Sequence, residues 1–139
     1  MSNPNGDLTS IGREKRVFLV EDDPDFAALF VNALKKSEFE VTVAGSAEEA
    51  LEIQKEYFWS MQFIDLQLPG MNGLELCRQI REDDAISLLV AITAHRNMFQ
   101  LIDAREAGFD DLYYKPIRSA EILDAVKQNS TRIERWERF

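Results

Sequence analysis

Carboxylate side chains follow two apolar runs in this chain, at positions where they could do chemistry. The stretch "VFLVEDDPDF" runs from four apolar residues into Glu21, Asp22 and Asp23, and the run "MQFID" ends in Asp65. Carboxylates that lie close together repel one another, which costs stability unless a cation lies between them. A site with only oxygen ligands suits a hard divalent ion, Mg²⁺ first and Mn²⁺ or Ca²⁺ next. The sequence therefore predicts a divalent metal site, provided that these two strand ends are neighbours.

Two further polar side chains follow apolar runs later in the chain. Thr93 ends "SLLVAIT", and Lys115 directly follows "DLYY". A hydroxyl and an ammonium beside a metal complement a phosphoryl group. A carboxylate between them, here Asp65, can attack phosphorus and form an acyl phosphate, while the metal screens the negative charge. The pattern indicates aspartyl-phosphate chemistry.

The elements that must position these residues alternate strictly along the chain. Short apolar or alternating runs predict strands at 16–20, 39–44, 61–65, 87–93 and 111–114. Apolar residues at helical spacing, with residues that favour helix starts, predict helices at 24–36, 46–57, 72–83, 97–107 and 119–136. This alternation predicts a doubly wound α/β domain, a parallel sheet with helices on both faces, which binds ligands at the carboxyl ends of its strands.

Composition sets limits on partners and location. The chain has 139 residues, enough for one domain, with 25 acidic and 16 basic residues and a formal net charge of −9. An acidic surface disfavours direct binding to nucleic acid or to an anionic membrane, so we expect neither partner. No apolar stretch reaches the roughly 20 residues of a membrane helix. The single cysteine, Cys77, fits a core position and a reducing cytosol, and we expect a cytoplasmic protein.

Four segments, in order and at family spacing, carry a resemblance over about residues 16–128. They are "FLVEDDP", "FIDLQLPGMNGLEL", "AITA" and "AGFDDLYYKPI". Together they resemble the receiver domain of the two-component response-regulator family, including chemotaxis receivers. The resemblance implies a flavodoxin-like (βα)5 fold with strand order 2-1-3-4-5. We therefore expect a flexible N-terminal tail at 1–15, a receiver domain at 16–128 and a C-terminal helix extension or linker at 129–139.

The resemblance also implies roles for the acidic residues. Asp65 is the expected phosphoacceptor, and a sensor histidine kinase or a histidine phosphotransfer protein is the expected donor, with Mg²⁺ present. Asp22, Asp65 and the backbone carbonyl of Gln67 are the expected direct metal ligands, and Glu21 is expected to act through water. A domain of this kind assists its own phosphorylation and dephosphorylation but turns over no external substrate, so we do not expect an enzyme.

The other half of the expected site handles the phosphoryl group. The resemblance implies that the Thr93 hydroxyl and the backbone amide of Ala94 bond phosphoryl oxygens. It implies that Lys115 pairs with the phosphoryl group and positions the Asp65 carboxylate. The Lys115–Pro116 peptide bond is expected to be cis, a form that is accessible mainly before proline.

Three positions leave alternatives open. His95 is expected to be simply exposed, but the resemblance also places His95 and Gln67 along the path of the hydrolysing water, where they would tune dephosphorylation. Leu112 stands where the family commonly has Tyr or Phe, three residues before the lysine. Either a different packing change carries the signal, or Tyr114 substitutes for the missing aromatic ring.

The last helix and the function keep alternatives as well. Val126, Ile133 and the pair Asn129 and Trp136 recur at seven residues, which fits either a short linker helix or a charged tail. If it is a linker, the chain is either a fragment of a longer regulator or a homodimer that pairs through this helix or through the face of 97–107, 111–114 and 119–136. The output partner is unknown. The rival functions are a receiver-like protein-binding module that acts without phosphorylation and a metal-dependent phosphatase or phosphotransferase.

Overall fold

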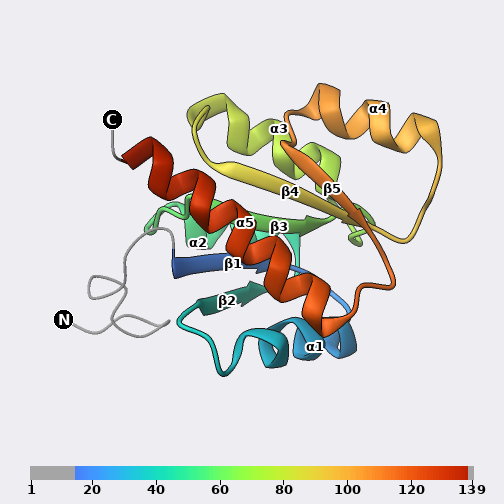
Figure 1. Cartoon of the computed structure of the whole chain (residues 1–139). Helices are drawn as coiled ribbons and strands as arrows, with labels where there is room; N and C mark the ends of the chain where they lie inside the picture. Colours follow the sequence, from blue (N-terminus) through green and yellow to red (C-terminus); the bar gives the residue numbers. More distant parts are fainter. Residues whose placement is uncertain (1–14, 138–139) are drawn as a thin grey trace.

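The computed structural model describes residues 15–137, which form a parallel five-stranded sheet with helices on both faces (Figure 1). The strands lie in the order β2-β1-β3-β4-β5, and each neighbouring pair is parallel. The predicted doubly wound, flavodoxin-like fold is confirmed. The elements, in chain order, are β1 (Arg16–Val20), α1 (Pro24–Leu34), β2 (Glu40–Ala44), α2 (Ala47–Gln54), β3 (Met61–Asp65), α3 (Gly73–Asp83), β4 (Leu88–Thr93), α4 (Met98–Ala107), β5 (Asp111–Tyr114) and α5 (Ser119–Glu137).

Polar side chains cap four of the helices that follow strands, the fourth being Asn97 at the start of α4. Asp23 accepts a hydrogen bond from the backbone N–H of Asp25, and Pro24 occupies the first helical position of α1. Ser46 caps α2 and Asn72 caps α3 in the same way. Such caps satisfy backbone donors that a helix leaves without partners in its first turn, so each helix begins directly after a strand-end loop.

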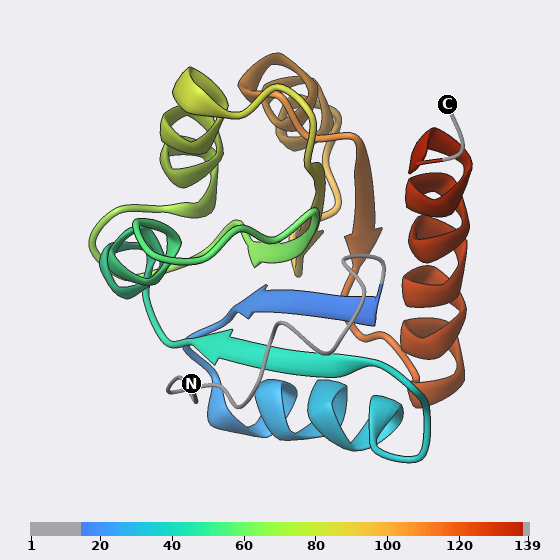
Figure 2. The ribbon, with the colours of Figure 1, turned by 90° about the vertical axis from the view of Figure 1, so that its left-hand side faces the viewer.

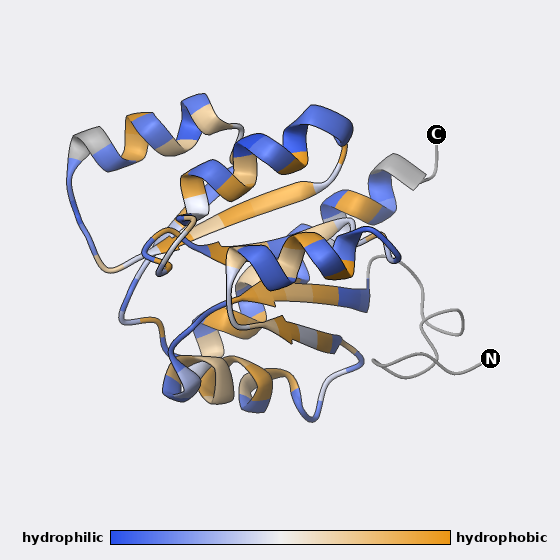
Figure 3. Cartoon of the chain, turned by 180° about the vertical axis from the view of Figure 1, so that it is seen from behind, coloured by the Kyte–Doolittle hydropathy of each residue, from blue (hydrophilic) through white to orange (hydrophobic). Residues whose placement is uncertain are grey.

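The two faces of the sheet carry separate hydrophobic clusters. Helices α1 and α5 cover one face, and α2, α3 and α4 cover the other (Figure 2). All six residues of β4 are buried, as expected for a central strand of a parallel sheet. Hydrophobic colours concentrate on the sheet, while the helices alternate between hydrophobic and hydrophilic residues (Figure 3). The burial of both faces keeps the strand ends at one edge rigid relative to one another.

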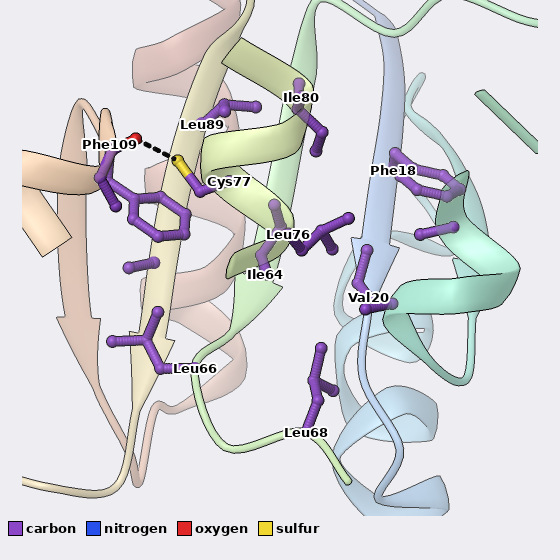
Figure 4. Packing of buried hydrophobic residues seen from close by; sticks show 14 of the residues in the cluster. Phe18, Val20, Ile64, Leu66, Leu68, Leu76, Cys77, Ile80, Leu89 and Phe109 are labelled. Carbon is purple, nitrogen blue, oxygen red and sulfur yellow. Dashed lines mark hydrogen bonds between the residues drawn. The ribbon is translucent and has the colours of Figure 1, made fainter. Parts of the chain in front are cut away.

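Cys77 belongs to the cluster under α3. The side chain is completely buried, and its thiol donates to the carbonyl oxygen of Ala107 at 3.4 Å, the dashed line in Figure 4. Burial raises the pKa of the Cys77 thiol to about 11, so the reactive thiolate is scarce at neutral pH. The structure places Cys77 in the core, as the sequence predicted.

Helix α2 is shorter than predicted, because aromatic residues after it pack on the sheet instead of continuing the helix. It ends at Gln54, where the prediction ended at 57. The ring of Trp59 stacks on Phe18 of β1 with centroids 4.6 Å apart, and Tyr57 meets Trp59 edge-on. The amide of Gln54 pairs reciprocally with Gln62, which satisfies this polar side chain between the apolar residues Met61 and Phe63 of β3.

The predicted tail at 1–15 lies outside the described residues except for Lys15, and the side chain of Trp136 is not described either. Helix α5 crosses position 128 without a break, and Asn129 and Ile133 beyond it are buried against the domain. The division at 128 into receiver domain and extension stays a prediction.

Gly73 offers a test of how tightly α3 approaches the strand end that carries Asp65. A Cβ atom at Gly73 would lie 2.3 Å from the carbonyl oxygen of Asp65 and 2.8 Å from Cα of Leu66. We expect Gly73→Ala to lower the free energy of unfolding by about 3 kcal/mol, because the backbone must shift to admit the methyl group. Urea titration measures the change.

Gly45→Ala is the matched control, because its Cβ would meet no atom closer than 3.7 Å. It should leave stability nearly unchanged. Equal unfolding midpoints for the two variants would contradict the close approach at Gly73.

Candidate functional site

The predicted site residues lie at the carboxyl ends of four neighbouring strands. Glu21 directly follows β1, Asp65 ends β3, Thr93 ends β4 and Lys115 directly follows β5. These strands are adjacent in the order β1-β3-β4-β5. The four side chains therefore come together at one edge of the sheet, where open α/β folds bind ligands.

Lys115 is the centre of this cluster. Its Nζ lies 2.6 Å from Oε1 of Glu21 and 2.9 Å from Oδ2 of Asp65, and it lies 4.4 Å from the centroid of the Phe26 ring. Burial alone would lower the pKa of Lys115, but the hydrogen bonds to Glu21 and Asp65 outweigh burial and raise it. The ammonium thus stays charged and neutralises part of the acidic cluster.

Glu21, Asp22 and Asp65 form the acidic cluster. Each offers a carboxylate oxygen, and these oxygens lie within 4.8 Å of one another. Glu21 and Asp65 are buried, whereas Asp22 is exposed. Burial, together with the neighbouring Asp65 carboxylate, raises the pKa of Glu21 to about 7, against the opposing effect of Lys115. One ammonium does not fully compensate the three carboxylates, and this all-oxygen donor set fits a hard divalent cation.

Glu21 makes direct contacts with protein groups at this edge of the sheet. Its side chain is completely buried, its Oε1 accepts from Lys115, and its Oε2 accepts from the backbone N–H of Asp23 at 3.2 Å. Sequence reasoning did not find this direct contact, because it joins residues 94 positions apart that follow β1 and β5, two strands that do not pair with each other. The roles assigned to Glu21 and to the other site residues stay predictions.

Gln67 links the two halves of the site. Its backbone N–H donates to Oδ1 of Asp65 at 2.8 Å. Its side-chain Oε1 accepts from the hydroxyl of Thr93 at 3.0 Å and from the backbone N–H of Ala94 at 3.4 Å. The sequence predicted that Gln67, Thr93 and Ala94 share one site, but it gave no sign that the Gln67 amide bonds the other two.

The remaining predicted positions surround this core. His95 is exposed, and its backbone N–H donates to Oγ1 of Thr93 at 3.0 Å. Leu112 is half-buried and packs against the cluster under α3, whereas Tyr113 packs on the opposite face of the sheet. Tyr114 lies under the guanidinium of Arg96, 4.5 Å from the ring centroid. No sequence signal indicated this cation–π pair.

The turn after β5 fixes the position of Lys115. The Lys115–Pro116 peptide bond is cis, and the backbone N–H of Lys115 donates to the carbonyl oxygen of Thr93 at 2.8 Å. The hydrogen bond from Lys115 to Thr93 extends the pairing of β4 and β5 by one residue. The lysine side chain therefore leaves the sheet at the same edge as Asp65.

Comparison with known proteins gives the family. The model of the response regulator receiver domain matches residues 17–127, most of the chain. The chain belongs to the response regulator receiver domain family. The family assignment expected from the sequence motifs is confirmed. Receiver domains of two-component response regulators are not enzymes in the usual sense.

Individual relatives agree with the family match. The DNA-binding response regulator MtrA of Mycolicibacterium smegmatis is 32% identical over 120 residues, which cover 86% of this chain and 52% of MtrA. The response regulator DrrB of Thermotoga maritima is 25% identical with a TM-score of 0.76, over 84% of this chain and 52% of DrrB. A CheY-like receiver domain protein of Methanospirillum hungatei has a TM-score of 0.81 at 24% identity, covering 87% of this chain and 97% of that one, which supports the fold.

One predicted absence is wrong. The net charge of −9 led to the expectation of no direct nucleic acid binding, yet the MtrA proteins that this chain resembles are DNA-binding response regulators. The chain spans about half the length of the curated relatives it matches. The acidity of a receiver region therefore says nothing about the DNA binding of a longer regulator. The phosphoryl donor and the homodimer stay predictions.

The described helices were also compared with the requirements for spanning a bilayer. None of those within residues 15–137 combines the length and the apolar composition that a membrane crossing needs. The cytoplasmic location expected from the sequence stays a prediction.

Removal of Lys115 tests its role as the counter-charge. We expect Lys115→Met to lower the free energy of unfolding by about 3 kcal/mol without added metal, because it leaves the buried carboxylates of Glu21 and Asp65 without their ammonium. Added Mg²⁺ should restore part of the loss. Lys55→Met is the control, since Lys55 pairs with Glu52 on the open surface, where such pairs contribute little. Equal effects of the two substitutions would contradict this role.

Glu21 makes a pH dependence of metal binding testable. Because its pKa is raised to about 7, a proton competes with a divalent cation below that pH and leaves when the cation binds. We expect Mg²⁺ affinity to rise roughly tenfold between one pH unit below and one unit above this pKa. Calorimetric titration of wild type and Glu21→Gln measures it, and the variant should lose most of the slope. If both proteins show the same pH dependence of Mg²⁺ affinity, the proton that competes with the cation belongs to another group.

Proposed function

We propose that this chain is the phosphoacceptor of a two-component system and that Asp65 accepts the phosphoryl group from a histidine kinase or a histidine phosphotransfer protein. The observation that carries the proposal is the way both oxygens of Asp65 are held. Oδ2 accepts from Lys115 and Oδ1 accepts from the N–H of Gln67. A carboxylate fixed in this way is held in one orientation at the strand ends, where a phosphoryl donor would approach.

The transfer itself needs a nucleophile and charge compensation. A carboxylate oxygen of Asp65 forms the new P–O bond while the P–N bond of the donor phosphohistidine breaks, and the departing imidazole recovers its ring nitrogen lone pair. The Lys115 ammonium, 2.9 Å from Asp65, neutralises charge beside the acyl phosphate. The hydroxyl of Thr93 and the backbone N–H of Ala94 supply donors for the phosphoryl oxygens.

A divalent cation completes this site. Asp22, Asp65 and the backbone carbonyl of Gln67 would hold Mg²⁺, with Glu21 acting through water, and Mn²⁺ or Ca²⁺ could replace it. The bound ion supplies positive charge that offsets repulsion between the carboxylates and the incoming phosphoryl group. The clustered oxygens and the raised pKa of Glu21 support this assignment.

The output follows from the added charge. A phosphoryl group on Asp65 replaces the single negative charge of the carboxylate with close to two on the phosphoryl oxygens at a buried edge of the sheet, which shifts an equilibrium between two conformations. Since MtrA is a DNA-binding response regulator of about twice the length, we propose that this receiver controls a DNA-binding output region. Because position 112 holds Leu, the change of conformation cannot depend on an aromatic ring at that position.

The residue two positions after Asp65 disfavours the phosphatase or phosphotransferase rival. Enzymes that use an aspartyl phosphate in this way usually have a second acid two residues after the nucleophile, and that position holds Gln67. The amide of Gln67 has no proton to give as an acid, and its oxygen already accepts from Thr93. The chemistry at this position favours a phosphoacceptor over an enzyme with external substrates.

The experiment is the intact-protein mass after incubation with acetyl phosphate and Mg²⁺. We expect a gain of about 80 Da, the mass of one phosphoryl group, that disappears in Asp65→Asn and without metal. Asp124→Asn, which changes an exposed aspartate of α5, should gain the same mass as wild type.

A mass gain that persists in Asp65→Asn would show that another residue carries the phosphoryl group. No gain in wild type, under conditions where another receiver domain is labelled, would refute the phosphoacceptor role and favour the protein-binding module.

A further inference from the structure

Two hydrogen-bond donors converge on one side-chain oxygen at the edge of the site. Oε1 of Gln67 accepts from the Thr93 hydroxyl at 3.0 Å and from the Ala94 backbone N–H at 3.4 Å. Only the oxygen end of an amide accepts, so the two donors together fix the orientation of this side chain. These are the same two donors that the proposed function assigns to phosphoryl oxygens.

The donors cannot serve both acceptors at once. A hydroxyl has one hydrogen and a backbone amide has one, so a bond to Gln67 excludes a bond of equal quality to a phosphoryl oxygen. Thr93 is completely buried, which leaves little access for water as a third partner. Its Oγ1 already accepts from the backbone N–H of His95, which restricts how the hydroxyl can turn.

The backbone of Gln67 keeps this side chain beside the phosphoacceptor. Its N–H donates to Oδ1 of Asp65 at 2.8 Å, so the amide oxygen extends from a residue anchored on the carboxylate itself. The side chain is only half-buried and can swing toward solvent without breaking that anchor. The Gln67 side chain can therefore release the Thr93 and Ala94 donors while its backbone stays bonded to Asp65.

We propose that the Gln67 side chain is an internal competitor for the phosphoryl group: in the unphosphorylated protein its amide oxygen occupies the Thr93 and Ala94 donors, and it must leave before they can bind the phosphoryl oxygens. This inference rests on the proposed function. Gln67 is a positioning residue that sets how readily the phosphorylated arrangement forms, because the population of the competent state scales the apparent affinity.

The test uses beryllofluoride with Mg²⁺ as a non-covalent stand-in for the phosphoryl group. Gln67→Met keeps the length of the side chain but removes the acceptor oxygen, and Gln67→Ala removes the side chain altogether. Gln128→Met is the control, since Gln128 is an exposed glutamine of α5. Calorimetry gives the affinity for beryllofluoride, and NMR gives the amide signal of Ala94 without any ligand.

Both Gln67 variants should bind beryllofluoride about tenfold more tightly than wild type, the effect of removing one to two competing hydrogen bonds. Their ligand-free Ala94 amide signal should shift and its hydrogen exchange should accelerate, whereas Gln128→Met should match wild type in both measurements. A merely structural role of Gln67 would change stability without tightening the binding.

The experiment distinguishes failure of the competitor proposal from failure of the phosphoacceptor function. If wild type and Gln128→Met bind beryllofluoride and both Gln67 variants bind no more tightly, the competitor proposal alone is wrong. If none of the four proteins binds it, the phosphoacceptor function is wrong and the competitor proposal fails with it.

Discussion

Repulsion among carboxylates at the carboxyl edge of the sheet is the constraint on which the rest of this structure depends. Glu21, Asp22 and Asp65 offer oxygens within 4.8 Å of one another, and two of the three side chains are buried. Such a group is costly in a folded protein unless positive charge and hydrogen-bond donors meet it. Burial, together with the neighbouring Asp65 carboxylate, raises the pKa of Glu21, which agrees with that cost.

Each neighbouring feature reduces this repulsion or exploits it. Lys115 reaches back from the end of β5 to bond two of the carboxylates, and the Phe26 ring covers its ammonium. The N–H of Gln67 holds the second oxygen of Asp65. In the proposed function, the remaining negative charge would attract a divalent cation, and the cation would make it feasible to add a phosphoryl group. The unfavourable electrostatics of the resting site and its proposed chemistry therefore have one origin.

The sequence was informative wherever short-range patterns decide the structure. Strands β1, β3 and β5 have the predicted bounds, and residues that favour helix starts cap α1, α2 and α3. Strand-end residues meet at one edge because a parallel sheet requires it. The early end of α2 was not predictable, because Tyr57 packs on Trp59, which stacks on Phe18 of β1, and these contacts depend on the tertiary fold.

The site shows the same limit. Residue types and spacing located Asp65, Thr93 and Lys115, but they could not show which donor faces which acceptor. The bond from Thr93 to Gln67 joins residues 26 positions apart, and the pair of Lys115 and Glu21 joins residues 94 apart. Composition misled on one point, since a charge balance taken over one region does not describe the partners of the longer regulators to which it is related.

The most direct test of the central claim is a crystal structure of the chain grown with Mg²⁺ and saturating beryllofluoride. Our account predicts that beryllium binds a carboxylate oxygen of Asp65 and that its fluorine atoms accept hydrogen bonds from Thr93 and Lys115. The metal should lie between that group and Asp22, and the Gln67 side chain should have left Thr93. Density for beryllofluoride at any other residue, or an Asp65 that still contacts only Lys115 and Gln67, would contradict the account.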